Sequence, residues 1–268
     1  MKIPVFNIDC QKDGEIELPK QFSEERKVSL IKKAVRVYLA NQRQKYGAFR
    51  LAGMRQSAEL SRRRRDYKTS YGHGISRVQR KVLSRRGSRM YWVGAVSPGT
   101  VGGRKAHPAK PDKLWNEKIN ISERRAAIRS ALSSATNKAL VQKRGYMIPD
   151  TYPFAVSKEF EEISKTKELI EKLKKLGFEN ELKRVSVAVK NKGRAKLRNR
   201  RKRSKKGLLL IVSKGCKLTR AARNIPGIDI VSINNLNTYN LAPGYNDGRA
   251  MLITVPSIEI IKKKNLFK

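Results

Sequence analysis

A long basic stretch between Gln42 and Trp115 constrains the fold of this chain more than any other feature. It carries 19 Lys or Arg residues against three acidic ones, and frequent glycines and prolines leave it little apolar periodicity. Only Arg77 to Arg86 has enough apolar residues to suggest one or two helical turns. Compact domains rarely contain a structureless loop of this length. We therefore predict that residues 45–111 form a long basic insertion loop, and that residues 1–44 and 112–268 form one globular body.

The apolar residues of the predicted body are gathered into blocks. Helical spacing predicts helices over residues 23–40, 122–145, 160–176 and 218–224 and from Ser257 onward. Short apolar runs predict strands at residues 154–156, 208–212, 228–233 and 251–255, while residues 180–189 fit either a helix or a strand. Strands that alternate with helices imply right-handed crossovers. The sequence thus predicts an α/β fold, a three-layer α/β/α arrangement with a mostly parallel central sheet.

A second basic segment lies inside the predicted body. Residues 190–206 contain 11 Lys or Arg residues among 17 and no acidic residue, which is the densest charge in the chain. Such a segment cannot bury enough apolar surface to fold alone. We expect it to form a second basic arm.

The formal net charge of +40 implies a polyanionic partner, because 62 basic residues against 22 acidic ones would otherwise repel one another. We find no run of about 18 apolar residues and no signal-like segment, so we expect a soluble intracellular protein without a membrane partner. Cys10 and Cys216 are far apart and belong to no paired spacing, which argues against a disulfide framework or a zinc site. Nucleic acid is the expected partner.

Few residues suggest catalysis. Gly94 to Thr100 has the glycine spacing of a phosphate loop but lacks its lysine, and Gly72-His73-Gly74 is only a fragment of a dinucleotide motif. His73 and His107 have no carboxylate nearby in sequence that would orient them as bases, and a cysteine such as Cys216 is usually a packing residue. We predict no enzymatic activity, no cofactor, no metal site and no small-molecule substrate.

Arginine-rich clusters are the strongest functional signal, because arginine bonds two phosphate oxygens or stacks on a splayed base. We predict that they place phosphate-binding charge along an extended backbone. The candidate RNA-binding residues are Arg43, Lys45, Arg50, Arg55, Arg62, Arg63, Arg64, Arg65, Lys68, Arg77, Arg80, Lys81, Arg85, Arg86, Arg89, Arg104, Lys105, Lys192, Arg194, Arg198, Asn199, Arg200, Arg201 and Arg203.

Aromatic residues accompany these cations. Tyr71, Tyr91 and Trp92 are candidates for stacking on unpaired bases. Anchoring the loop to the body is the competing interpretation for Tyr91 and Trp92, and for Trp115 it competes evenly with stacking.

Several stretches resemble one known family, the universal large-subunit ribosomal protein family designated L-four in its archaeal and eukaryotic form. The resemblance covers most of the chain. It is carried by Val37-Tyr38-Leu39-Ala40, Arg43-Gln44, Trp115-Asn116 with Lys118 and Asn120, Arg124-Arg125-Ala126, Lys192-Gly193-Arg194, Arg198-Asn199-Arg200-Arg201, Ala222 to Gly227 and Leu241-Ala242-Pro243-Gly244.

The resemblance implies a structural, rRNA-stabilising constituent of the large ribosomal subunit, located in the cytoplasm. Its long loop would reach through rRNA toward the polypeptide exit tunnel and help to form the tunnel wall. Gly72, His73, Gly74, Ile75, Ser76 and Arg77 resemble the family's loop tip, although His73 and Ile75 replace more usual residues. The implied partners are large-subunit rRNA and neighbouring large-subunit proteins, including one whose hairpin lines the tunnel.

Two other functions compete with this interpretation. An RNA-modifying or RNA-cleaving enzyme on a parallel sheet would need a cofactor loop or clustered acids, and the sequence offers neither. A DNA-compacting protein would match the charge, but long irregular arms suit folded RNA better than a uniform duplex.

Overall fold

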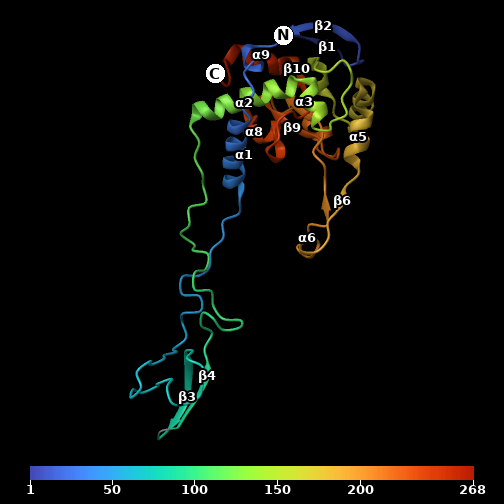
Figure 1. Cartoon of the computed structure of the whole chain (residues 1–268). Coiled ribbons are helices and arrows are strands. Elements are labelled where there is room, and N and C mark those ends of the chain that lie inside the picture. The colour runs from blue at the N-terminus through green and yellow to red at the C-terminus, as the bar shows by residue number, and fades with distance from the viewer. Residues whose placement is uncertain (88) are drawn as a thin grey trace. The chain divides into compact units, whose positions relative to one another are not determined.

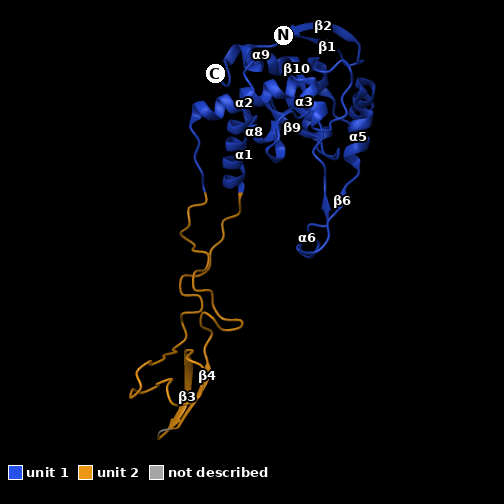
Figure 2. Cartoon of the chain, viewed as in Figure 1, with its two compact units in different colours: residues 1–42, 116–268 blue, residues 43–115 orange. Residues whose placement is uncertain are grey.

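The computed structural model describes residues 1–87 and 89–268. It divides into two compact units (Figure 2). Met1–Gln42 together with Asn116–Lys268 form one unit, called the body below, and Arg43–Trp115 form the other, called the insertion unit. Each unit is described by itself.

A six-stranded sheet forms the centre of the body, in the order β2-β1-β5-β10-β8-β9. Figure 1 labels β1, β2, β9 and β10 of this sheet. Only β1 and β2 pair antiparallel, and every other neighbouring pair is parallel. The predicted α/β fold with a mostly parallel sheet is therefore confirmed. The strands are β1 (Lys2–Phe6), β2 (Lys12–Glu17), β5 (Ala155–Val156), β8 (Leu209–Val212), β9 (Asp229–Ser232) and β10 (Met251–Thr254).

Successive residues of the buried strands point to opposite faces of the sheet, and both faces are covered. Leu210 and Leu252 belong to one apolar cluster, whereas Leu209 and Ile253 belong to the other. The helical segments that contribute to the first cluster are α3 (Lys138–Lys143), η2 (Lys158–Glu162), α4 (Thr166–Leu173), η3 (Lys174–Phe178) and α7 (Lys217–Ala222). Those of the second are η1 (Lys20–Phe22), α1 (Val28–Gln42), α2 (Ile121–Thr136), η4 (Ile233–Asn235), α8 (Thr238–Leu241) and α9 (Val255–Lys264).

Several predicted boundaries differ from the structure. The first helix begins at Val28, because Ser23 instead follows the 3-10 turn η1 (Lys20–Phe22) and the Lys27 N–H donates to Ser130 Oγ at 2.7 Å. The predicted helix over 122–145 is two helices, and Asn137 between them accepts from Leu140 N–H.

The structure also differs from inexact predictions, or decides open ones, in the second half of the body. The predicted helix over 160–176 is a 3-10 turn, then α4, then a π turn that contains Gly177 with φ +88°. The ambiguous residues 180–189 mostly form α5 (Glu179–Ser186). The four predicted strands are present, whereas β1 and β2 were not predicted.

A buried arginine joins four segments of the body. Arg249 is 0% exposed, and its guanidinium donates to the carbonyl oxygens of Gly207 and Asn240, both at 2.8 Å, and lies 2.7 Å from a carboxylate oxygen of Asp229. Burial raises the pKa of Asp229, but the positive charges of Arg249 and Lys206 outweigh that effect and hold it below its usual value. The buried charge therefore has both a counter-ion and hydrogen-bond partners.

The insertion unit has a different construction. Its regular structure is one antiparallel hairpin of β3 (Arg80–Arg86) and β4 (Arg89–Gly94), so the helical alternative for residues 77–86 was wrong. Among its described residues only Ser70, Ala95 and Ser97 are buried, all of them small. A unit without large buried apolar side chains gains little stability from its own packing.

Candidate nucleic-acid interface

The insertion unit leaves most of its cations without acidic partners. Arg50 pairs with Asp112 at 2.5 Å, and Lys68 pairs with Glu59 at 2.9 Å. The third acid, Asp66, accepts instead from the Ser61 hydroxyl and the Tyr67 N–H. These are the only ion pairs within residues 43–87 and 89–115. The remaining cations thus form a concentrated positive surface.

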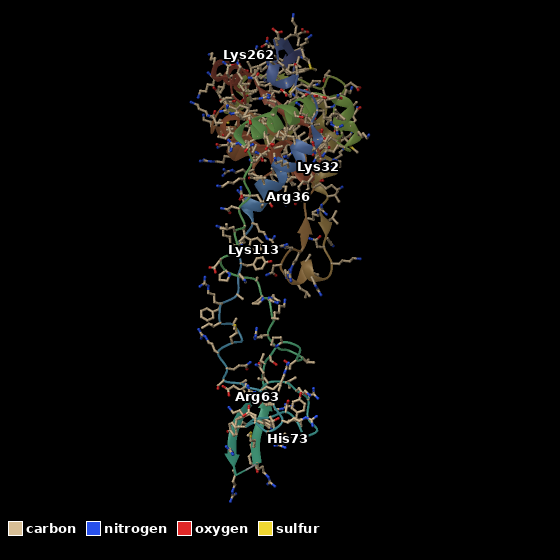
Figure 3. The ribbon with its side chains drawn as sticks, turned by 60° about the vertical axis from the view of Figure 1, so that its left-hand side comes forward. Lys32, Arg36, Arg63, His73, Lys113 and Lys262 are labelled. Carbon is tan, nitrogen blue, oxygen red and sulfur yellow. The ribbon has the colours of Figure 1, made fainter. Side chains whose placement is uncertain are left out.

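A loop packed beside the hairpin carries one dense cluster. Isolated bridges join Glu59 to Arg80 and Ser61 to Thr69, and the Thr69 hydroxyl donates to the Arg63 carbonyl at 2.6 Å. These contacts fold the loop back on itself, and the four consecutive arginines 62–65 are all exposed. Figure 3 shows Arg63 and His73 beside the hairpin strands.

Two of the three predicted stacking residues are already covered by cations. The Tyr71 ring has the Arg77 guanidinium at 4.6 Å and that of Arg64 at 5.8 Å. Trp92 has Arg80 at 5.5 Å and the His73 ring edge-on at 6.2 Å. Tyr91, by contrast, is 51% exposed. Of the three, Tyr91 has the ring most available to an RNA base.

The predicted tip residues 72–77 form an open turn beside β3. Gly72 and Gly74 have φ of +78° and +65° with open space around them, a backbone that side chains rarely adopt. The Ser76 carbonyl accepts from Arg80 at 2.6 Å and from the Val78 N–H at 2.9 Å, which ties the end of the turn to the hairpin. His73 and Arg77 are exposed, and Ile75 is half-buried.

The other predicted cations of the insertion unit fall into two groups. The hairpin carries Arg80, Lys81, Arg85 and Arg86 on β3 and Arg89 on β4, with Arg86 opposite Arg89. The two segments that lead to the hairpin and away from it carry Arg43, Lys45, Arg50, Arg55, Arg104 and Lys105.

The second arm is a narrow two-stranded ribbon. β6 (Val189–Lys190) pairs with β7 (Lys202–Arg203), and the turn between them contains α6 (Arg194–Leu197). The Asn191 side chain donates to the Arg200 carbonyl at 2.8 Å, and Asn199 has a φ of +60°. Among the described residues of the arm only Lys206 has an acidic partner, Asp229. The structure thus brings together Lys192, Arg194, Arg198, Asn199, Arg200, Arg201 and Arg203.

The root of this ribbon is fixed to the body. The Gly207 N–H donates to the Gly227 carbonyl at 2.8 Å, and Arg184 donates to the Lys206 carbonyl at 3.0 Å. Gly227 has a φ of +73°, and a Cβ there would lie 1.9 Å from Val185, so only glycine permits this close approach.

Comparison with known proteins identifies the family. The family model described as the ribosomal protein L4/L1 family matches residues 16–264. The chain belongs to the ribosomal protein L4/L1 family. This result confirms the predicted resemblance and the prediction that the chain is not an enzyme.

Members of the L4/L1 family from several archaea align with nearly the whole chain. The large ribosomal subunit protein uL4 of Nanoarchaeum equitans is 43% identical over 100% of both chains. The proteins of that name from Methanococcus aeolicus and Archaeoglobus fulgidus are 36% identical over 98% of this chain and 37% identical over 97%, covering 100% and 98% of their own lengths.

In this L4/L1 chain, Trp115 lies where the two ends of the insertion unit meet. Its ring is contacted by Arg43 at 4.4 Å, Lys113 at 4.5 Å and Tyr46 at 4.7 Å between ring centroids. Residues from both ends of the unit therefore meet on one indole. All three contacts lie within the insertion unit, so anchoring to the body and base stacking both stay predictions for Trp115.

The prediction missed exposed apolar residues of the L4/L1 chain that lie among these cations. Phe49 and Met54 are each 57% exposed, and Arg55 lies 4.4 Å from the centre of the Phe49 ring. Their position next to arginines in the sequence was the available signal.

Other site chemistries find no support among residues 1–87 and 89–268. No cluster of three or more metal-ligating side chains occurs there, and no helix is sufficiently long and apolar to span a bilayer. Cys10 and Cys216 are free.

Proposed function

We propose that this chain is a structural component of the large ribosomal subunit, in the cytoplasm, and that it binds and stabilises rRNA. The observation that carries the proposal is the set of arginines and lysines on the insertion unit and the second arm that have no acidic partner. Phosphates of folded RNA would neutralise them. The relatives, named as large-subunit proteins, support this assignment.

The second arm and the insertion unit suit different features of folded RNA. The second arm is a thin ribbon whose cations surround a short turn, so it fits between RNA segments with little bulk. The insertion unit adds exposed aromatic surface at Tyr91, which suits unpaired bases. We propose residues 45–111 as the loop that enters rRNA and residues 190–206 as the second contact.

The test is co-sedimentation with purified large subunits after a high-salt wash, followed by RNA crosslinking and peptide mapping. We expect the chain to stay with the subunit and crosslinks to map to residues 62–65 and 198–201. Arg26 is the matched control position, where we expect no RNA crosslink, since its guanidinium is bound to Asp247 at 2.6 and 3.0 Å. Release of the chain by the wash, or crosslinks spread evenly over the body, would contradict the proposal.

We further propose that residues 72–77 help to form the wall of the exit tunnel, next to a neighbouring large-subunit protein whose hairpin lines it. The open turn at Gly72 and Gly74 supports this placement, because glycine leaves the backbone uncovered, and the exposed His73 between them would be free to contact a nascent chain.

A photocrosslinker at position 73 should react with a stalled nascent chain, and the same group at position 26 in the body should not. Reaction from the body position alone would reject the tunnel assignment while leaving rRNA binding intact.

A further inference from the structure

The insertion unit contains a pocket that the phosphate-binding clusters do not explain. It has a volume of about 320 Å³ and lies between residues 48–54 and residues 104–112. The Ala48 N–H donates to the Ala109 carbonyl at 2.7 Å, so the two segments run side by side. Both segments belong to the insertion unit, which is orange in Figure 2.

Two glycines let these segments touch on either side of the pocket. A Cβ on Gly47 would lie 2.4 Å from the Pro111 Cα, and one on Gly53 would lie 2.6 Å from the Arg104 Cβ. Gly53 also has a φ of +73°, which disfavours other residues. Between these contacts the backbones separate enough to leave the pocket open.

The pocket lining combines apolar and cationic groups. Phe49 and Met54 supply apolar surface, and both remain 57% exposed. Arg104 and Lys110 supply positive charge, while Arg50 is paired with Asp112, the one acidic residue of the lining. An apolar surface large enough for a planar group, surrounded by cations, matches the two chemical halves of a nucleotide.

The volume agrees with such a ligand, since small-molecule sites begin at roughly 300 Å³. Bases stack on aromatic rings whatever their sequence, because every base has a π face. The Arg55 guanidinium lies over one face of the Phe49 ring, 4.4 Å from its centre, and the 57% exposure of Phe49 leaves ring surface for a base on the other face.

We propose that this pocket binds one unpaired nucleobase of the RNA, stacked on Phe49, with the adjoining phosphate held by Arg104 or Lys110. The inference rests on the proposed rRNA binding and adds a specific recognition element to it. RNA is favoured over a protein segment because the surrounding unit is strongly cationic and its acids are few.

The experiment uses the full chain and two RNA duplexes with the same base pairs. One carries an additional bulged 2-aminopurine, and the other is fully paired. We expect tighter binding of the bulged duplex and a change in 2-aminopurine fluorescence on binding. Phe49→Ala should reduce the preference for the bulge by about tenfold, in keeping with the loss of one base-stacking contact. Affinity for the paired duplex should stay unchanged.

Two further variants make the test specific. Ala52→Phe should fill the pocket and abolish the preference without removing any charge, because Ala52 lines it. Leu51→Ala is the matched control, since Leu51 is an exposed neighbour that does not line the pocket. Circular dichroism checks that each variant keeps the body folded.

The outcomes separate this inference from the proposed function. Equal affinity of the unmodified chain for both duplexes, or an equal loss of preference with Leu51→Ala, overturns the pocket assignment alone. If the unmodified chain binds neither duplex, the proposed rRNA binding is overturned as well.

Discussion

Outside the second arm, the body and the insertion unit use their arginines in opposite ways. In the body, Arg26, Arg184 and Arg249 are each bound to a carboxylate, and large apolar clusters cover both faces of a sheet. In the insertion unit the described residues bury no large apolar side chain, and only Arg50 and Lys68 have acidic partners. The apolar clusters therefore stabilise the body, whereas we expect the insertion unit to depend on an external anion for much of its order.

The largest expected effect comes from removing a body cation. Arg249→Met should destabilise the body by about 3–5 kcal/mol, because Asp229 and two carbonyl groups would lose their buried partner. Urea unfolding measures the change. Arg198→Met in the second arm is the matched control and should shift stability by less than about 0.5 kcal/mol. Equal effects of the two substitutions would remove the distinction between paired and unpaired arginines.

The reverse test removes cations from the second arm. Replacing Arg198, Arg200 and Arg201 with Ala should weaken rRNA binding. It should also make the negative slope of log affinity against log salt concentration shallower by about two units, since each lost phosphate contact reduces the magnitude of that slope by roughly 0.7–0.9. The comparison variant replaces Lys262, Lys263 and Lys264 in the last turn of α9, which removes the same charge from the body. If both triple variants lower the slope equally, net charge rather than arm geometry controls binding.

Acid should affect the body through its paired carboxylates. The hydrogen bond from Arg26 lowers the pKa of Asp247, although burial partly opposes this, and Asp229 is lowered as described above. A lowered pKa in the folded state stabilises the body above the unfolded value near 3.8, and this contribution is lost as pH falls through the folded value.

Thermal melting from pH 5 to pH 2 measures this effect. Asp247→Asn should lower the melting temperature at pH 5 and flatten its fall below pH 4. Asp66→Asn in the insertion unit should leave the profile unchanged, and a matching response from that variant would contradict the assignment to body ion pairs.

The smallest expected effect is that of deleting Gly47 to Ala109. The body's apolar clusters include no residue of this segment, so its melting temperature should stay within about 2 °C of the full chain. Circular dichroism and thermal melting provide the measurement. A collapsed body would show that the insertion unit contributes to folding, which would break the comparison.

The sequence predicted elements whose signal lies within a few neighbouring residues. The run Leu208 to Val212 is apolar throughout, as a strand covered on both faces requires. β2 was missed because its only large apolar residue is Ile16. The hairpin was missed because most residues of β3 are basic, and its pairing with β4 depends on contacts across the turn rather than on apolar alternation.

The candidate interface likewise has parts that the sequence predicted and parts that it did not. Charge density alone identified the arginine clusters, because each lies in one short segment. The nucleobase pocket needs Phe49 and a segment more than 50 residues later in the chain, and Tyr71 meets Arg64 and Arg77 only once the loop has folded. Nothing in the sequence around Arg249 separates a buried arginine from an exposed one.

The fixed root of the second arm has a consequence for the thermodynamics of binding. Because the bonds at Gly207 and Lys206 and the close packing at Gly227 hold both strands where they leave the body, the arginines at the turn sample a smaller volume than those of a free tail. Less conformational entropy is then lost when RNA immobilises them. A pre-organised ribbon thus retains more of its electrostatic attraction as net affinity.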